Sequence, residues 1–233
     1  MNNKEKVLLE KYKELNMGYL KAFLCMNLGK TLGIKELLPI AEKSQCHNTG
    51  WPIGVVLTKE DHAPYPIENG VEAVISGWTG FDYWFLEKNG NFYFIRKFEE
   101  DKEPTKTKTG KNVLWFDIQI WRVGEVLLYC LNLGRELQLD FSKKVDVDIT
   151  YKGLKDRVLS CNNRNRAWFH DDLYFSRVEE FNFHFSESLD YIKLNFKELV
   201  FNIISELTYY FNKFNLERRI CDDIVDEFLN SKV

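Results

Sequence analysis

Residues 81–97 read FDYWFLEKNGNFYFIRK, and this stretch decides the fold class. Two runs rich in aromatic residues, 81–86 and 91–97, flank Lys88-Asn89-Gly90, and Asn-Gly is a strong signal for a tight hairpin turn. Aromatic side chains pack well against each other across paired strands. The stretch therefore predicts an antiparallel β-hairpin and, with its neighbours, a sheet.

The rest of the chain supplies further strands and several helices. Hydrophobic periodicity and turn residues predict strands at 52–57, 71–76, 145–151 and 173–185, and 113–117 is a further short apolar segment. The same signals predict helices at 34–43 (bent or ended near Pro39), from about 118 to 137, from Ser188 as N-cap to about 214, and at 217–229. Because consecutive strands are joined by short turns, we expect an α+β fold, a mostly antiparallel sheet packed by several helices.

The N-terminal segment is predicted to be a helical arm. Between residues 4 and 27 the apolar side chains recur every three or four positions, which indicates one amphipathic helix carrying Leu8, Tyr12, Leu15, Tyr19, Phe23 and Met26 on one face. The polar stretch 44–50 is the plausible boundary. We therefore expect an N-terminal helical arm at 1–47 and an α+β domain at 48–233.

Composition limits the classes of protein to which the chain can belong. A net charge of −3 argues against a general nucleic-acid coat, which needs a broad positive field. The five cysteines are odd in number and have no Cys-x-x-Cys spacing, so we expect reduced thiols and a cytoplasmic location. The N-terminus lacks the apolar core of a signal peptide, and no run of about 18 apolar residues predicts a membrane span.

Signatures of catalysis are weak. The acidic runs 99–101 and 171–172 could hold a divalent cation, although acidic runs at strand ends are more often solvated. The four histidines lack the spacing of a metal site, and the chain has neither a nucleophile elbow nor a phosphate-binding loop. We expect no catalytic residue, no metal and no cofactor, and we keep a metal-dependent hydrolase as an alternative.

Two polar loops carry basic residues. One spans 101–111 and the other 160–172, and the second interleaves arginines with a tryptophan. Cationic and aromatic side chains together can grip single-stranded nucleic acid by charge and stacking. The alternative function is therefore nucleic-acid or nucleotide binding, with these candidate residues: Lys106, Lys108, Lys111, Arg164, Arg166 and Trp168.

A series of short motifs runs through most of the chain in a fixed order. They are GWPIGVVL at 50–57, PYPIENGVEA at 64–73, Asp82-Tyr83-Trp84, Gly90-x-Phe92-Tyr93, FEED at 98–101, Asp117 with Arg122 and Glu125 before LLYC, Gly153-Leu154-Lys155-x-Arg157-x-Leu159, and Ile224-Val225-x-x-Phe228. With these motifs the chain resembles the C-terminal region of bacterial proteins described as ATP-binding or Schlafen/Alba-type DNA-binding proteins.

The resemblance implies a bacterial accessory or sensor domain. In those proteins an Alba-type domain comes first, whereas residues 1–47 stand in its place here, so the DNA-binding label is not expected to transfer. The implied setting is a regulatory system or antiviral (antiphage) defence, by analogy. We expect a non-catalytic domain that acts with a partner protein or self-associates through its N-terminal helix. The candidate contact residues, carried over from the motifs, are Trp51, Asp82, Trp84, Arg122, Glu125 and Arg157, of which the two tryptophans also suit a core.

Overall fold

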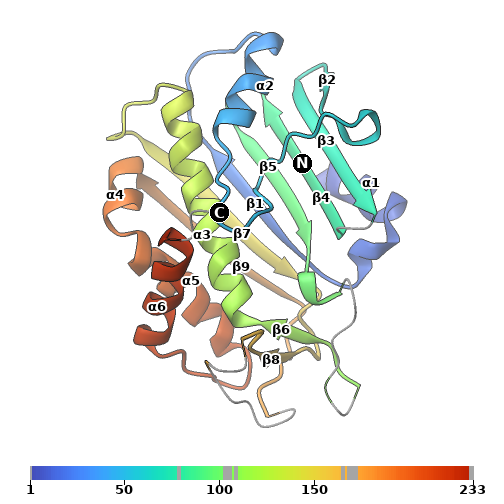
Figure 1. Ribbon diagram of the computed structural model, residues 1–233, viewed down its shortest axis with the longest axis vertical. Coiled ribbons are helices and arrows are strands. Elements are labelled where there is room, and N and C mark those ends of the chain that lie inside the picture. The colour runs from blue at the N-terminus through green and yellow to red at the C-terminus, as the bar shows by residue number, and fades with distance from the viewer. Residues whose placement is uncertain are drawn as a thin grey trace.

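The computed structural model describes residues 2–77, 80–101, 107, 110–163, 166 and 173–230. Its centre is a seven-stranded antiparallel sheet (Figure 1). The strands lie in the order β2 (Tyr65–Ile67), β3 (Gly70–Gly77), β4 (Gly80–Glu87), β5 (Phe92–Lys97), β1 (Tyr19–Cys25), β7 (Lys144–Lys152) and β9 (Glu180–Ser188). A separate parallel pair is formed by β6 (Val113–Trp115) and β8 (Val158–Ser160).

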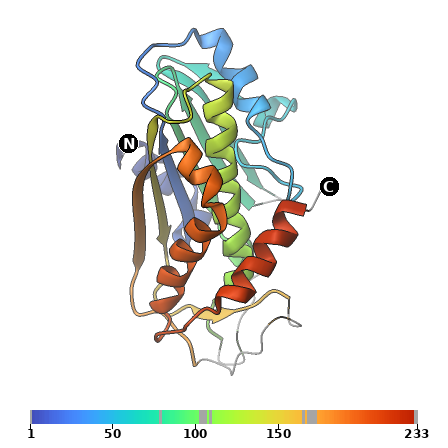
Figure 2. The same cartoon turned by 90° about the vertical axis from the view of Figure 1, so that its left-hand side faces the viewer.

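Most of the helices cover one face of this sheet, with the long α3 in the middle (Figure 2). The helices on this face are α2 (Ile34–Lys43), α3 (Phe116–Glu136), α4 (Leu189–Leu194), α5 (Phe196–Tyr209) and α6 (Arg218–Asn230). The opposite face carries α1 (Asn2–Lys11) and the 3-10 turn η1 (Lys13–Asn16). Two more 3-10 turns are η2 (Glu60–His62) and η3 (Glu99–Asp101). The predicted α+β class, with helices packed on a mostly antiparallel sheet, is confirmed.

Alternation along the strands explains the two cores. On β5, Phe92 and Phe94 face the helical layer, and the Phe92 ring lies 4.3 Å from that of Tyr129 on α3. The intervening Tyr93 and Ile95 face α1 instead. Because successive strand side chains point to opposite faces, one aromatic strand stabilises both layers. The hairpin predicted between β4 and β5 is confirmed, and Gly90 adopts a positive φ of 85° in its turn.

The helix predicted over 4–27 is wrong beyond Lys11. Residues Tyr19–Cys25 form β1, a central strand hydrogen-bonded to both β5 and β7. Gly18, at φ 153°, separates the two structures, and the apolar spacing of the segment fits a short strand as well as a helix. Residues 1–47 therefore supply a central strand of the sheet as well as α1 and α2, and α1 packs on the sheet of its own chain.

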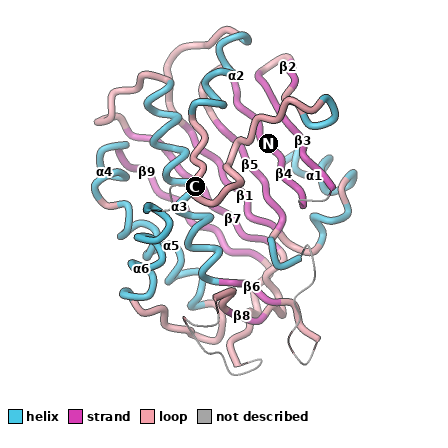
Figure 3. Tube along the Cα trace, in the orientation of Figure 1, coloured by secondary structure: helices cyan, strands magenta, loops and turns pink. Residues whose placement is uncertain are grey.

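Other boundaries shift for local reasons. The strand predicted at 52–57 is an irregular loop between α2 and β2 (Figure 3), and the strand predicted from 173 begins only at Glu180. Pro39 lies inside α2 without ending it. The predicted cap at Ser188 is confirmed, because its hydroxyl accepts a hydrogen bond from the Tyr191 amide, but the helix after it divides at Asn195. Across the described residues, no helix has the length and apolarity needed to cross a lipid bilayer.

Candidate functional site

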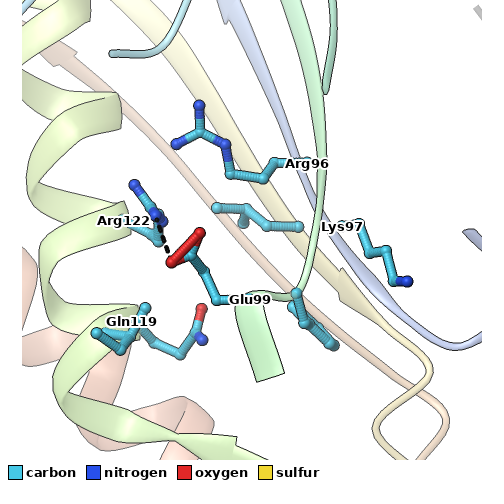
Figure 4. A pocket seen from close by; sticks show the side chains of 8 residues that line it. Arg96, Lys97, Glu99, Gln119 and Arg122 are labelled. Atoms are coloured by element: carbon cyan, nitrogen blue, oxygen red, sulfur yellow. Dashed lines mark ion pairs between the residues drawn. The ribbon is translucent and has the colours of Figure 1, made fainter. Parts of the chain in front are cut away.

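A group of charged side chains lies between the sheet and α3. Asp82 comes from β4 and Arg96 from β5, where the two residues are directly paired in the strand register. Arg122 and Glu125 come from one side of α3, three positions apart, and Trp51 from the loop before β2. We call these five residues the charged cluster. Figure 4 shows Arg96 and Arg122 approaching the same space from the strand and the helix.

The centre of the charged cluster is a buried, bidentate ion pair between Arg96 and Asp82. Arg96 donates from Nε to Asp82 Oδ1 at 2.8 Å and from Nη2 to Asp82 Oδ2 at 2.7 Å, and each residue is 5% exposed. Trp51 donates its indole N–H to Asp82 Oδ2 at 2.7 Å, and the Pro52 carbonyl accepts from Arg96 at 3.1 Å. Burial alone would lower the pKa of Arg96, but the Asp82 and Glu125 carboxylates hold it above its ordinary value. The guanidinium therefore stays charged.

Glu125 ties this pair to α3. Its Oε2 accepts from Arg122 Nη1 at 2.6 Å and from Arg96 Nη1 at 3.4 Å, and its Oε1 accepts a short hydrogen bond from the Thr49 hydroxyl. The other terminal nitrogen of Arg122, Nη2, forms an ion pair with Glu99 Oε2 at 3.4 Å. Glu125 is fully buried, so both of its oxygens are satisfied by neighbouring side chains rather than by water.

The space beside the cluster is very small. A cavity of about 10 Å³ is lined by apolar and polar side chains from around β5, η3 and α3, and the polar ones include Arg96, Glu99, Gln119 and Arg122 (Figure 4). That volume admits about one water molecule. The charged cluster thus joins the loop at 49–52, two strands and α3 into one network of side-chain contacts.

Four of the six candidate contact residues meet in this cluster, namely Trp51, Asp82, Arg122 and Glu125. They meet through Arg96, which the sequence analysis did not single out. A signal for it exists, because Arg96 occupies the same face of β5 as Phe92 and Phe94, where a charge must find a buried partner. Trp84 lies outside the charged cluster. It is fully buried, and its indole N–H donates a hydrogen bond to the Val55 carbonyl at 2.8 Å.

Arg157 forms a second buried ion pair away from the cluster. It is 1% exposed and donates to both oxygens of Asp101, at 3.0 and 2.5 Å. Its other three N–H groups donate to backbone carbonyls of Gly153 at 2.7 Å, Val113 at 2.9 Å and Met17 at 2.7 Å. All five donors of the guanidinium are therefore used inside the fold, where they clamp four separate segments of the chain.

The acidic run 99–101 does not converge on one point. Glu99 pairs with Arg122 and Asp101 with Arg157, so two of its carboxylates are bound by different arginines. In the described ranges, no three side chains of His, Cys, Asp or Glu gather closely enough to hold a metal ion. The other acidic run, 171–172, lies outside the described residues. The hydrolase alternative thus gains no support from the run 99–101.

Glu100, the middle residue of that run, is buried without a counter-charge of its own. Its Oε1 accepts from the Trp115 amide at 2.6 Å and from Gln119 Nε2 at 3.2 Å. Its Oε2 has no hydrogen-bond partner in the described part of the chain. Burial raises the pKa of Glu100 to about 7, although hydrogen bonds from the backbone amides of Trp115 and of Glu100 itself and the nearby Arg157 charge act against this. This carboxyl titrates near neutrality because of its burial.

One of the two basic loops leads to a compact cation–aromatic group. The Lys111 ammonium lies 5.0 Å from the centre of the Phe175 ring, and the Arg177 guanidinium lies 4.9 Å from the same centre. Phe175 and Arg177 were not singled out from the sequence. We call these three residues the cation–aromatic group.

The remaining candidates for nucleic-acid contact fall into two sets. Arg166 is engaged inside the protein, with Asp117 at 3.7 Å and with Glu227 in a short ion pair. The others lie outside the described residues: Lys106, Lys108, Arg164 and Trp168.

Comparisons of the chain with protein-family models, with curated proteins and with solved structures found no match. The resemblance suggested by the sequence motifs therefore stays a prediction.

Proposed function

We propose that this protein is a non-catalytic interaction module that binds a partner protein along strand β9. The observation that carries the proposal is a set of exposed apolar side chains on the helices next to that strand. Leu194 on α4 is 82% exposed and Tyr209 at the end of α5 is 57% exposed, and Tyr191 and Tyr210 are exposed close to them in the chain. We call these four residues the apolar strip.

The helices that carry the apolar strip lie beside an open edge of the sheet. Figure 2 shows α4 and α5 beside β9, and the Tyr210 ring lies 5.7 Å from that of Phe181 at the start of this strand. Within the described residues, β9 pairs with β7 and has no strand on its other side. An edge strand presents unpaired backbone N–H and C=O groups, which a partner can use to add a strand.

The size of the edge supports recognition of a partner. β9 runs for nine residues, so an added strand has room for a full set of backbone hydrogen bonds. The apolar strip would then supply side-chain contacts on the helical side of the edge. Clustered aromatic and large apolar side chains of this kind are the usual energetic centres of protein interfaces.

The charged cluster fits a non-catalytic role. Its carboxylates and guanidiniums are bound to each other, and the adjoining cavity admits about one water. Catalytic groups need access to a substrate, whereas these groups hold α3 on the sheet. The proposed setting, antiphage defence in the bacterial cytoplasm, rests on the resemblance of the sequence motifs alone.

The test compares capture of a partner by matched variants. Tagged protein is purified from its native host after nuclease treatment, in the wild-type form and as Leu194→Asp and Leu229→Asp. Leu229 is an exposed leucine on α6, outside the apolar strip, so its variant controls for the added charge. We expect one stoichiometric protein with the wild type and with Leu229→Asp, and its loss with Leu194→Asp. Equal capture by all three forms would contradict the proposed surface.

The cation–aromatic group favours nucleic-acid binding as a second candidate function. Two cations beside one aromatic ring offer positive charge for the phosphates of a nucleic acid. We expect the wild type to bind single-stranded DNA or RNA with an affinity that falls steeply as the salt concentration rises. The double variant Lys111→Glu, Arg177→Glu should lose this binding, whereas Lys35→Glu, an exposed change on α2, should keep it. Binding that is absent or insensitive to salt in the wild type would remove this candidate.

A further inference from the structure

Helix α1 is bound to the sheet through side chains that enter ready-made polar sites. On one of them, Lys4 Nζ reaches both oxygens of Glu72 on β3, at 2.9 and 2.8 Å. Glu72 is 3% exposed and also accepts from the hydroxyls of Tyr65 at 2.8 Å and Tyr83 at 2.7 Å. Burial would raise the pKa of Glu72, but these three donors hold it below its ordinary value. The sheet therefore presents a site for a cation.

The next residue of α1 enters a site of opposite charge. Glu5 is 6% exposed and accepts from the Tyr19 hydroxyl at 2.6 Å and from Lys21 Nζ at 2.9 Å, and Lys152 Nζ lies 3.2 Å away. Burial would raise the pKa of Glu5, but the Tyr19 and Lys21 hydrogen bonds and the two lysine charges hold it below its ordinary value. The donors all come from β1 and β7. This face of the sheet therefore also presents a site for a carboxylate.

Apolar contacts complete the docking of the segment. Leu8, one turn after Lys4, is 3% exposed and packs with Tyr83, Tyr93 and other outer-face residues of β4 and β5. Tyr12 follows, with its ring 4.9 Å from that of Phe81. Residues one turn apart share a helix face, so α1 presents Lys4, Glu5 and Leu8 together. The outer face of the sheet thus recognises a helix of the pattern Lys-Glu-x-x-Leu.

The connection between α1 and the sheet is short. Seven residues, 12–18, separate the end of α1 from the start of β1. A cavity of about 210 Å³ remains between this connection and the sheet, lined by Leu15, Asn16, Gly18 and Lys152 among others. A fully extended seven-residue segment spans about 23 Å, which is enough to carry α1 away from its own sheet.

We propose that the outer face of the sheet is a helix-docking site and that α1 of a second copy of this chain is its alternative occupant. All the contacts described above are made by side chains, so α1 of another copy makes them equally well. Two copies that exchange α1 form a closed symmetric dimer at little energetic cost. The inference does not rest on the partner surface proposed along β9.

Concentration decides between the two occupants in the wild type. A segment tethered by a short linker has an effective concentration on the order of millimolar at its own site. The wild-type chain is therefore a monomer at micromolar concentration, with dimer accumulating toward millimolar. Weakening the contact within one chain, while leaving it intact between two different chains, shifts this balance toward the dimer.

Reversing the charge of Lys4 in one variant and of Glu72 in another weakens the contact within each chain and leaves it intact between the two variants. Lys4→Glu places a carboxylate opposite Glu72, and Glu72→Lys places two ammonium groups opposite each other. When the two variants are mixed and exchange α1, both docking sites regain opposite charges. Sedimentation velocity at micromolar concentration should show about tenfold more dimer in the mixture than in either variant alone, which is what two restored ion pairs supply together. The variant that carries both changes in one chain should return to a monomer.

Two controls keep the test decisive. Lys6 and Glu68 are exposed on α1 and in the turn before β3, and no ion pair joins them among the described residues. A mixture of Lys6→Glu with Glu68→Lys should stay monomeric. If Glu72→Lys fails to fold, the same experiment uses Glu5→Lys with Lys21→Glu. Monomer throughout the matched mixture, or equal dimer in the control mixture, would overturn the proposal.

Discussion

Replacing Glu100 by glutamine should make the protein more stable at pH 8. The carboxyl is 1% exposed, and burial raises its pKa from the ordinary value of 4.5 to about 7. Between these two values the folded state retains a proton that the unfolded state has released. The stability that Glu100 contributes is therefore fully present below pH 4.5 and is lost as the pH rises to about 7.

The size of the effect follows from the same two values. At about 1.4 kcal/mol for each pH unit between 4.5 and about 7, the free energy of unfolding falls by at most about 3–4 kcal/mol. Glutamine keeps the oxygen that accepts from Trp115 and Gln119 but cannot ionise. At about 2–4 °C for each kcal/mol in a chain of this size, Glu100→Gln should melt several degrees above the wild type at pH 8.

Urea unfolding of both proteins at pH 5 and at pH 8 measures this prediction. The difference between the two free energies of unfolding isolates Glu100 from the other carboxyls, including Asp101. Glu99→Gln is the matched control, because Glu99 is partly exposed and paired with Arg122, so its loss should bring no gain at pH 8. A Glu100→Gln advantage that is absent, or that is equal at both pH values, would refute the reasoning.

Three further substitutions test the buried networks, each by urea unfolding. Arg157→Ala should cost about 3–5 kcal/mol, because it leaves the Asp101 carboxylate buried without its partner; a midpoint close to the wild type would show that the clamp is dispensable. Trp51→Phe removes one donor to Asp82 and should cost about 1–2 kcal/mol, and an unchanged midpoint would speak against the charged cluster as a structural tie. Gly54→Ala should cost at least about 1 kcal/mol, because φ is 67° there and an added Cβ would lie 2.8 Å from the Tyr129 hydroxyl; a neutral effect would contradict this packing.

Local signals were sufficient for most of the sheet and helices. The Asn89-Gly90 turn, the alternation along β7 and the cap at Ser188 each report a conformation fixed by neighbouring residues. The N-terminal segment was assigned incorrectly because its apolar spacing fits both a helix and a strand. What selects the strand is its pairing with β5 and with β7. The paired residues are 68 to 78 positions away in β5 and 121 to 133 positions away in β7, so a local sequence pattern does not reveal the pairing.

The candidate site was predictable only in part, for a similar reason. The motifs identified Trp51, Asp82, Arg122 and Glu125, and the structure brings them together. The connecting Arg96 was overlooked, although its inward position on an aromatic strand marks it as a buried charge. The apolar strip was also missed, because whether a tyrosine or leucine on a helix is exposed depends on which neighbour covers it, and that is decided by the tertiary fold.

Hydrogen–deuterium exchange on the protein purified from its native host, with and without its nuclease-resistant partner, tests the proposed interaction surface most directly. We expect slower exchange of the backbone amides of β9 and α4 in the complex, because a partner bound along the edge protects its open hydrogen-bonding groups. Amides of β3 and β4 should exchange at the same rate in both samples. Protection confined to another part of the molecule, or purification that recovers no partner protein, would contradict an interaction module that acts through β9.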